Sequence, residues 1–348
     1  MNHSSKPMIT TIIPTYRRPK LLQRAIRSVL NQTYPHLQVC VYDNASNDET
    51  AYVVAEIAKT DSRVKYYCHP ENIGAIANFN YGLKHVDTPF FSFLSDDDLL
   101  LPNFYLMAMK GFDKFPDAMF SAGSTIFITD KGRVELVDLS LWKREGYYAP
   151  PEGLFALLNG GPVWTSILFR KEVVKEVGLL DINTGAVSDG DFVFRIAARF
   201  PNIVYKEPCA IFMIHDLSSC SSSLNLASIW PGYLNMIHNI SEDKRIPLDV
   251  CLRAEKIMTF NLKCYLFSFG FFFIKQKNFE DAYKIADILR KQYNQKTKAI
   301  IVYSAAKLFQ HLPMGSDIFF NGVVKIRRYL RKGALQKQFG GYVQYLQK

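Results

Sequence analysis

Apolar and polar positions alternate along the first hundred residues in a strand-then-helix rhythm. The β-branched run Met8–Ile13 predicts a strand that stops at Pro14. Apolar residues then recur with a period of 3.6 over 21–30, which indicates an amphipathic helix with Pro19 near its start. The same rhythm continues with a strand at Leu37–Tyr42, a helix at about Glu49–Lys59 and a strand at Val64–Tyr67. This alternation predicts right-handed βαβ units and a mostly parallel, Rossmann-like sheet.

The next strand of this half ends in an acidic cluster. The apolar run Pro89–Leu94 reads as a buried strand of a parallel sheet, and Asp96, Asp97 and Asp98 follow it. Three neighbouring carboxylates repel one another, and hard cations such as Mg²⁺ or Mn²⁺ relieve that repulsion. Ligands in open α/β sheets bind at the carboxyl ends of strands. The alternative is a solvated turn before a helix N-terminus, and the cluster alone does not decide between the two.

Beyond Pro102 the pattern loosens before it becomes wholly helical. Strands are expected at 119–129, 163–169, 203–205 and 209–214, and short helices at 171–177 and 189–200. From about Leu226 onward only helical patterns remain. The predicted fold class is therefore α/β, with a helical carboxyl-terminal region.

Composition narrows the class of protein. Hydrophobic residues make up 48% of the 348 and charged residues 21%, as is typical of a globular protein. The first residues lack a charged stretch followed by an apolar one, so no signal peptide is expected. The six cysteines form no CxxC pair, which argues against a zinc site or a disulfide framework and favours a reducing compartment. A GxGxxG motif is absent, which argues against a dinucleotide dehydrogenase.

Charge divides the chain unevenly. The formal net charge is +10, yet residues 1–229 carry −2 and residues 230–348 carry +12. A basic carboxyl-terminal third suggests a separate task there, directed at an anionic surface or ligand.

Six motifs in order resemble glycosyltransferase family 2, the inverting nucleotide-sugar enzymes with the GT-A fold. The resemblance covers about Ile9 to Ser221. The motifs are Ile12–Tyr16, Tyr42–Asp48, Glu71–Asn78, Leu94–Asp98, Ser188–Asp189 with Arg195, and His215–Ser219. Ser95 and Ser188 stand where the family usually has acids. The resemblance implies a GT-A catalytic domain at 1–225 (nucleotide half about 8–102, acceptor half about 103–221) and a basic helical region at 226–348.

For the nucleotide, the resemblance implies a set of contacts in the first half. The stretch Pro14, Thr15 and Tyr16 would line the base, and Asp43 would accept a hydrogen bond from a pyrimidine imide N–H. The alternative for Asp43 to Asp48 is an Asx-rich turn that caps the following helix. Asn72, Gly74 and Asn78 are further candidates: Gly74 allows a turn or a close approach of the backbone, and Asn78 either reaches the ribose or braces helix packing.

The acidic cluster then becomes the candidate metal site. Asp98, with Asp96, is expected to bind Mn²⁺ or Mg²⁺, which bridges the donor phosphates, while Asp97 would hold ribose or sugar hydroxyls. His215 is a candidate for the metal or a phosphate oxygen, and a satisfied structural histidine is the equal alternative.

Inversion needs one carboxylate that deprotonates the acceptor hydroxyl. The resemblance makes Asp189 the candidate base and Asp191 the runner-up, with the other acid capping a helix. Arg195 either contacts phosphate or braces one of these acids through an ion pair.

The carboxyl-terminal region contains the two segments that could contact a membrane. The apolar stretch 257–274 contains Asn261 and Lys263 and is expected to be a buried or interfacial helix rather than a span. Basic residues at 325–332 lie among aromatic ones, which suits an anionic membrane surface better than a plain solvated face. Nucleic acid is not expected, because no binding motif accompanies the charge.

Together these patterns predict a metal-dependent inverting glycosyltransferase of the cytoplasm, with peripheral membrane contact as a further expectation. Its donor would be a UDP- or dTDP-type sugar, and its acceptor a saccharide or lipid-linked saccharide of surface polysaccharide synthesis. Two alternatives stay open. A sugar nucleotidyltransferase would want a glycine-rich loop after the first strand, where this chain has Pro14-Thr-Tyr-Arg-Arg18. A non-catalytic saccharide-binding or assembly protein on the same scaffold has only Ser95 and Ser188 in its favour.

Overall fold

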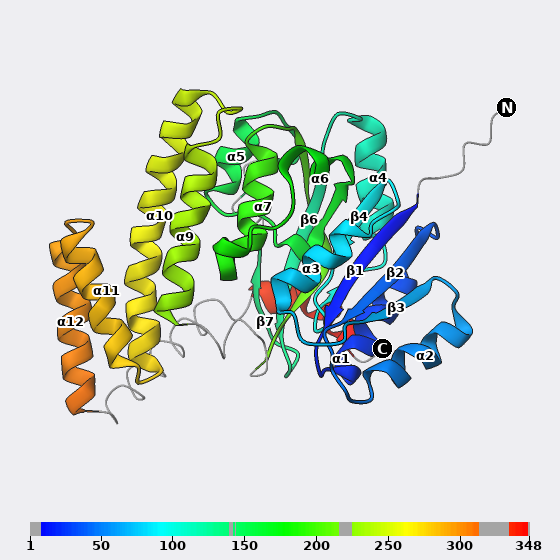
Figure 1. Cartoon of the computed structure of the whole chain (residues 1–348), viewed down its shortest axis with the longest axis horizontal. Helices are drawn as coiled ribbons and strands as arrows, with labels where there is room; N and C mark the ends of the chain where they lie inside the picture. The colour runs from blue at the N-terminus through cyan, green and yellow to red at the C-terminus, as the bar shows by residue number, and fades with distance from the viewer. Residues whose placement is uncertain (1–7, 139–141, 143, 216–224, 313–333, 347–348) are drawn as a thin grey trace. The chain divides into compact units, whose positions relative to one another are not determined.

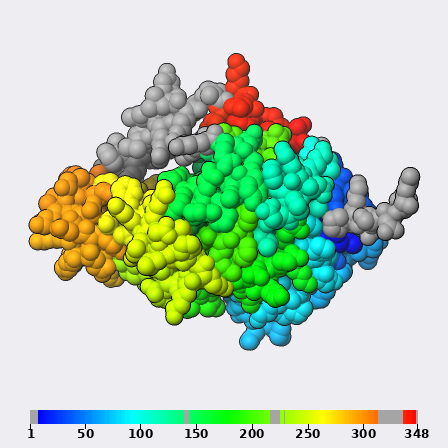
Figure 2. All heavy atoms as spheres, turned by 90° about the horizontal axis from the view of Figure 1, so that it is seen from above, coloured from blue at the N-terminus to red at the C-terminus, as the bar shows by residue number. Residues whose placement is uncertain are grey.

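The computed structural model describes residues 8–138, 142, 144–215, 225–312 and 334–346. The chain forms two compact units, Met1–Ser222 with Phe339–Lys348, and Ser223–Gln338. We describe each unit by itself. The carboxyl-terminal residues Phe339–Leu346 group with the first unit, and Figure 2 shows them in red on its surface.

The first unit is a mixed sheet covered by helices on both faces (Figure 1). Its strands are β1 (Ile9–Thr15), β2 (Leu37–Asp43), β3 (Val64–Cys68), β4 (Phe90–Phe93), β5 (Leu99–Leu100), β6 (Phe120–Thr129), β7 (Val134–Val137), β8 (Gly146–Tyr148), β9 (Ile167–Arg170) and β10 (Asn202–Ile214). Its helices are α1 (Pro19–Leu30), α2 (Thr50–Thr60), α3 (Ala75–Lys84), α4 (Phe104–Lys114), α5 (Glu152–Leu157), α6 (Glu172–Val177) and α7 (Ser188–Ala197), with 3₁₀ turns η1 (Trp164–Ser166), η2 (Ile182–Val187) and η3 (Gly340–Leu346).

Strand order explains where a site can form. Within the described residues the sheet runs β3-β2-β1-β4-β9-β6-β10-β5, with β7 beside β6 and β8 beside β10. The strands β3, β2, β1 and β4 are parallel, as the βαβ rhythm predicts, whereas β9 is antiparallel to both β4 and β6. The amino end of β9, with η1 before it, therefore lies at the same edge as the carboxyl end of β4.

The core of this unit follows from the apolar pattern. Side chains of β1, β2 and β4 such as Ile13, Val41 and Phe91 are fully buried. Helix α1 turns Leu22, Ala25, Ile26 and Val29 toward the sheet, as its period of 3.6 predicts. Gly82 of α3 allows a close approach, because a Cβ there would lie 2.6 Å from Ile12 Cγ2 and 2.8 Å from Tyr42 Cε2.

Two local differences from the sequence expectation have physical causes. The predicted strand at 163–169 begins as the 3₁₀ turn η1, where Trp164 packs on Phe79 and Phe93 at ring distances of 4.5 and 4.8 Å. The two strands expected at 203–205 and 209–214 are one strand, β10, whose register against β6 shifts between Val204 and Ala210. A bulge of this kind contains the proline, Pro208, that a regular ladder would not tolerate.

The second unit is helical in its described part. Its helices are α9 (Leu226–Ser241), α10 (Leu248–Lys275), α11 (Phe279–Lys291) and α12 (Lys296–His311), and α14 (Ala334–Phe339) lies mostly within it. Their buried side chains, among them Leu266, Phe273 and Ile285, form one core cluster. In the described part of the chain, α10 is a helix long and apolar enough to cross a membrane. Core helices of soluble proteins pass the same test of length and composition. Residues Lys325 to Lys332, on which the membrane prediction rested, lie outside the described residues.

Candidate active site

The predicted site residues that follow β1, β2 and β4 lie at the carboxyl edge of the parallel strands. Register pairs Thr15 at the end of β1 with Asp43 at the end of β2. Strand β4 pairs with β1 up to Phe93, so the residues Ser95–Asp98 emerge at the same edge. Asp96, Asp97 and Asp98 are all buried, with exposed fractions of 5%, 8% and 1%. The loop after β4 therefore holds three carboxylates that water barely reaches.

Arg18 joins the first two of these carboxylates. One guanidinium nitrogen, Nη1, donates to Asp96 Oδ1 at 3.1 Å and to Asp97 Oδ2 at 2.9 Å. Thr15 Oγ1 donates to the other oxygen of Asp96 at 2.8 Å. Burial nevertheless raises the pKa of Asp96 to about 6, and the charge of Arg18 opposes that rise. Arg18 was not among the site residues predicted from the sequence.

Asp98 faces away from that cluster and into the sheet. Its Oδ1 accepts the backbone N–H of Met213 on β10, and its Oδ2 accepts the Thr165 hydroxyl of η1, both at 3.0 Å. Burial raises the pKa of Asp98 well above its ordinary value, and Asp97 adds to the rise. Asp98 thus ties β10 and η1 to the loop after β4, and both of its oxygens are engaged.

His215 lies at the end of β10 and meets the cluster from the other side. Its Nε2 is 3.0 Å from Asp97 Oδ2. Among the described residues, the hydrogen bonds to Asp97 all fall on Oδ2, so Oδ1 remains open to a cation. The remainder of the predicted motif, residues 216–219, lies outside the described residues.

These donors give a partial fit to a divalent cation. No group of three or more His, Cys, Asp or Glu side chains converges as a ready-made cage within the residues that the structure describes. Mg²⁺ and Mn²⁺ at phosphate sites need only one or two protein carboxylates, since phosphate oxygens and water complete the shell. Asp97 and His215 suit that pattern, whereas Asp98 would first have to release its two hydrogen bonds. The metal assignments of Asp96, Asp98 and His215 stay predictions, and the geometry favours Asp97.

The loop after β2 is held in one shape by Asp43. Its Oδ1 accepts from the backbone N–H and the hydroxyl of Ser46 at 2.9 and 2.5 Å, and its Oδ2 accepts from Tyr66 OH at 2.6 Å. Ala45 and Asn47 have positive φ angles of 61° and 52°. Such strained positions in non-glycine residues cluster at binding sites. Asp43 is thus an Asx-turn residue here, and a base N–H would have to share Oδ2 with Tyr66.

Two asparagines brace this loop. Asn78 donates from Nδ2 to Tyr42 O at 2.8 Å, and its Oδ1 is 3.0 Å from His69 Nε2. Asn72 Oδ1 accepts from Asn44 Nδ2 and from the backbone N–H of Gly74, both at 2.9 Å. Gly74 has φ of 86° and open space where a Cβ would stand, so backbone conformation explains this glycine. The contacts of Asn72 and Asn78 with the described residues are therefore those of bracing residues.

The end of β1 offers one exposed aromatic ring. Tyr16 is 39% exposed, and the guanidinium of Arg17 lies 5.0 Å from its ring centre. Pro14 is half-buried and still pairs with Tyr42 in the sheet. Arg17 donates from its backbone N–H to Ser46 Oγ at 2.8 Å, which joins the loops after β1 and β2. Tyr16 is thus free to stack on a planar ligand at this edge.

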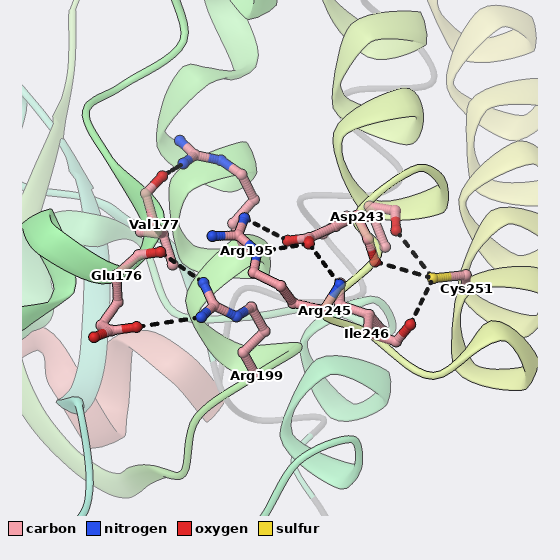
Figure 3. A network of polar contacts seen from close by, with 9 residues as sticks. Glu176, Val177, Arg195, Arg199, Asp243, Arg245, Ile246 and Cys251 are labelled. Atoms are coloured by element: carbon pink, nitrogen blue, oxygen red, sulfur yellow. Dashed lines mark hydrogen bonds and ion pairs between the residues drawn. The ribbon is translucent and has the colours of Figure 1, made fainter.

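The two candidate bases differ sharply in their surroundings. Asp191 is fully buried and pairs with Arg195 Nε at 2.8 Å, one helical turn along α7. Figure 3 shows Arg195 of α7, and Arg199 just beyond the end of that helix, reaching toward the end of α6, where Arg195 donates to Val177 O and Arg199 to Glu176. Arg195 also donates to Leu179 O at 2.9 Å. Of the two predicted roles of Arg195, the structure shows the brace.

Asp189, unlike Asp191, has no ion-pair partner among the described residues. It lies in the first turn of α7, half-buried, and its Oδ1 accepts the backbone N–H of Gly190 at 2.7 Å. Burial raises the pKa of Asp189, as suits a proton acceptor that must also release its proton. Helix α7 packs on η1, the turn that begins with Trp164. Asp189 is accordingly better placed for chemistry than Asp191, although its role stays a prediction.

Comparison with known proteins decides the family. Residues 10–178 match the family model "Glycosyl transferase family 2". This part of the chain, just under half of it, belongs to glycosyltransferase family 2. The predicted family, the α/β fold with a helical carboxyl-terminal region, and the enzyme class are confirmed at this level.

Two relatives match parts of the chain. A Campylobacter jejuni GalNAc(5)-diNAcBac-PP-undecaprenol beta-1,3-glucosyltransferase is 40% identical over 96 residues, which are 27% of this chain and 31% of that protein. An uncharacterized glycosyltransferase of Rickettsia typhi is 25% identical over 236 residues, which are 66% and 73% of the two chains. The chain thus spans under a third of the first relative.

Solved structures share the fold. Staphylococcus aureus TarS 1–349 in complex with UDP-GlcNAc has a TM-score of 0.62 at 17% identity and covers 88% of this chain and 92% of its own. The mannosyltransferase PcManGT from Pyrobaculum calidifontis, in complex with GDP-Man and Mn²⁺, has a TM-score of 0.54 at 17% identity, with 97% and 88% covered. At this identity they show the fold alone.

Proposed function

We propose that this family 2 protein is a metal-dependent, inverting glycosyltransferase that uses a nucleoside-diphosphate sugar. The observation that carries the proposal is the meeting of Asp96, Asp97 and His215 at the carboxyl edge of the sheet, next to the loop that Asp43 shapes. Ligands of open α/β sheets bind at that edge. A sugar nucleotidyltransferase would want a glycine-rich loop after β1, and β1 leads instead into Tyr16, Arg17 and Arg18.

The donor would lie across the loops after β1, β2 and β4. We place the base beside Tyr16 and Asp43, with a pyrimidine imide N–H shared at Asp43 Oδ2, which favours UDP or dTDP. Asp97 and His215 would hold Mn²⁺ or Mg²⁺ at the diphosphate. When bound, such a cation offsets negative charge on the nucleoside-diphosphate leaving group. The PcManGT complex with GDP-Man and Mn²⁺ supports this class of donor and metal in the fold.

Asp189 would take the acceptor proton. In an inverting transfer the acceptor oxygen bonds to the anomeric carbon, the bond from that carbon to the diphosphate oxygen breaks, and the hydroxyl proton passes to the base. Asp189 stands in the first turn of α7 with its pKa raised by burial. The buried pair of Asp191 and Arg195 would fix the helix that presents it.

For the acceptor we propose a saccharide or lipid-linked saccharide, as in surface polysaccharide synthesis. The support is the name of the Campylobacter relative, which specifies an undecaprenol-linked glycan.

A ligand screen tests the donor proposal. Thermal shift and calorimetry with UDP, dTDP and GDP sugars are run with Mn²⁺, with Mg²⁺ and with chelator. We expect metal-dependent stabilisation by a uridine or deoxythymidine diphosphate sugar, and loss of it in Asp97→Asn. Asp61→Asn is the matched control, because Asp61 pairs with Arg63 away from this edge. Stabilisation by no nucleotide sugar under any of these conditions would refute the proposal.

We also propose that the protein lies on an anionic membrane surface through α12. This helix has no acidic residue, carries Lys296, Lys298 and Lys307, and exposes Ile300 (64%), Leu308 (53%) and, just beyond its end, Leu312 (58%). An amphipathic helix with basic and bulky apolar residues on its open face suits the headgroup region of anionic lipids. Vesicle co-sedimentation tests it: Ile300→Ser with Leu308→Ser should lose binding to anionic vesicles, whereas the equally exposed Ile182→Ser should not. Undiminished binding of the α12 variant would refute the role of this helix.

A further inference from the structure

Arg18 occupies an unusual place in the acidic cluster. It stands between β1 and α1, and a single nitrogen, Nη1, is within 3.1 Å of Asp96 Oδ1 and 2.9 Å of Asp97 Oδ2. Its side chain is 20% exposed, and those of Asp96 and Asp97 are 7% and 11% exposed. One positive centre that bridges oxygens of two neighbouring carboxylates has the arrangement of a bound cation. The chain itself thus supplies a cation at the edge where the donor is proposed to bind.

The carboxylates need such a partner. Asp96, Asp97 and Asp98 follow one another directly, and each is buried. Neighbouring buried carboxylates disfavour joint ionisation, and a cation within about 4 Å relieves that cost. His215 contributes a full charge only when it is protonated, so Arg18 is the permanent counter-charge in contact with both Asp96 and Asp97.

A divalent cation on the open Oδ1 of Asp97 would share that carboxylate with Arg18, which is bound to Oδ2. A metal bound to Asp97 would lie about 2.0–2.2 Å from a carboxylate oxygen. Arg18 Nη1 lies 2.9 Å from Asp97 Oδ2 and 3.1 Å from Asp96 Oδ1. A metal ion on Asp97 and the guanidinium would repel each other at such short range. Arg18 must therefore leave Asp97 when the metal enters. The donor diphosphate then offers it a new partner, because a guanidinium matches phosphate oxygens in a planar, two-bond geometry.

We propose that Arg18 is a positioning residue that stands in for the metal in the empty site, yields Asp97 to the incoming cation, and turns to the donor diphosphate. The inference rests on the proposed function, since it needs a metal and a diphosphate at this edge. The proposal predicts that one substitution at Arg18 has opposite effects on the binding of the metal and of the nucleotide. Removal of the guanidinium should strengthen metal binding in the absence of nucleotide and weaken nucleotide binding in the presence of metal.

Direct binding measurements test this prediction without any sugar transfer. Mn²⁺ is titrated into the full chain and followed by the EPR signal of free Mn²⁺, first without nucleotide and then with UDP. In Arg18→Gln we expect Mn²⁺ alone to bind about five- to tenfold more tightly, as loss of a partly buried competing ion pair implies. At saturating Mn²⁺, UDP should bind about tenfold more weakly, since a charged hydrogen bond is lost.

Two variants complete the design. Arg27→Gln removes an equal charge from the exposed side of α1, the helix that follows Arg18, and should change neither affinity. Arg18→Lys keeps the charge and the fold, and should restore Mn²⁺ affinity toward the wild-type value while UDP affinity stays low, because an ammonium lacks the planar fork. It also serves as the test if Arg18→Gln does not fold.

The outcomes separate the two proposals. Wild-type protein that binds Mn²⁺ normally, with Arg18→Gln equal to it or weaker, overturns the stand-in role and leaves the metal proposal intact. Wild-type protein that binds no Mn²⁺, with or without UDP, overturns both. A fall in UDP affinity without a gain in Mn²⁺ affinity shows a phosphate contact alone and also overturns the stand-in role.

Discussion

The two acids of α7 provide the sharpest test of the catalytic assignment. Asp189→Asn removes the proposed base while the side chain keeps its shape. Without a base the rate should fall about 10²- to 10⁴-fold, which corresponds to about 3–5 kcal/mol of transition-state stabilisation. Burial disfavours the charged form of Asp189 and raises its pKa, so a neutral Asn should leave the melting temperature unchanged or higher.

Asp191→Asn should behave in the opposite way. The Asp191 side chain is 0% exposed and that of Arg195 is 10% exposed, and their 2.8 Å contact is a buried ion pair. Removing one partner of such a pair leaves a buried charge uncompensated and costs about 3–5 kcal/mol. The carbonyls of Val177 and Leu179 retain hydrogen bonds to Arg195, which places the expected loss near the lower end of that range.

The assay combines single-turnover transfer, donor titration and urea unfolding on both variants. We expect Asp189→Asn to bind donor with wild-type affinity and wild-type stability while transfer is lost. Asp191→Asn should unfold at lower urea and transfer in proportion to the folded fraction. Full activity in Asp189→Asn, together with an inactive but fully stable Asp191→Asn, would show that the base assignment is reversed.

Three further predictions follow from single contacts. Burial raises the pKa of Asp138 to about 6, so the contribution of this carboxyl group to stability is full below about pH 4 and is lost as pH rises through about 6. The difference in unfolding free energy between wild type and Asp138→Asn should therefore change with pH between about 4 and 6. A difference that stays constant over this range would contradict the prediction. Gly82→Ala should destabilise by about 1–3 kcal/mol in urea unfolding, since its Cβ would overlap Ile12 and Tyr42, and a neutral result would show that α3 can shift. Asp98→Asn should lower the melting temperature but retain metal-dependent donor binding, because its oxygens tether β10 and η1; loss of metal binding with normal stability would return the metal role to Asp98.

The sequence predicted well those features that depend on local pattern. The βαβ rhythm of β1 to β4 follows from periodicity and β-branched runs, and the positions of Asp43 and Asp96 at strand ends follow from the same pattern. The antiparallel insertion of β9 and the bulge of β10 depend on long-range pairing, which no local window contains.

Within the site, the residue types were easier to predict than their partners. Three consecutive acids indicated a charged cluster, but which of them faces Arg18 and which faces Met213 depends on the path of the loop after β4. Arg18, Tyr66 and Thr165 were not predicted as site residues, because each reaches its carboxylate from another strand or turn. The basic pair Arg17-Arg18, in the loop between β1 and α1, was the available signal for Arg18.

Asp138 has a consequence for how this protein can diversify. Its Oδ1 accepts the backbone N–H of Thr125 at 2.6 Å, and its Oδ2 accepts that of Val163 at 3.1 Å. One carboxylate thus anchors both ends of the segment between 138 and 163 to β6. We expect the segment to be constrained by more than these two anchors, because β8 within it pairs with β10 and Leu154 of α5 is fully buried. Sequence variation should therefore be tolerated at its exposed positions rather than in its length.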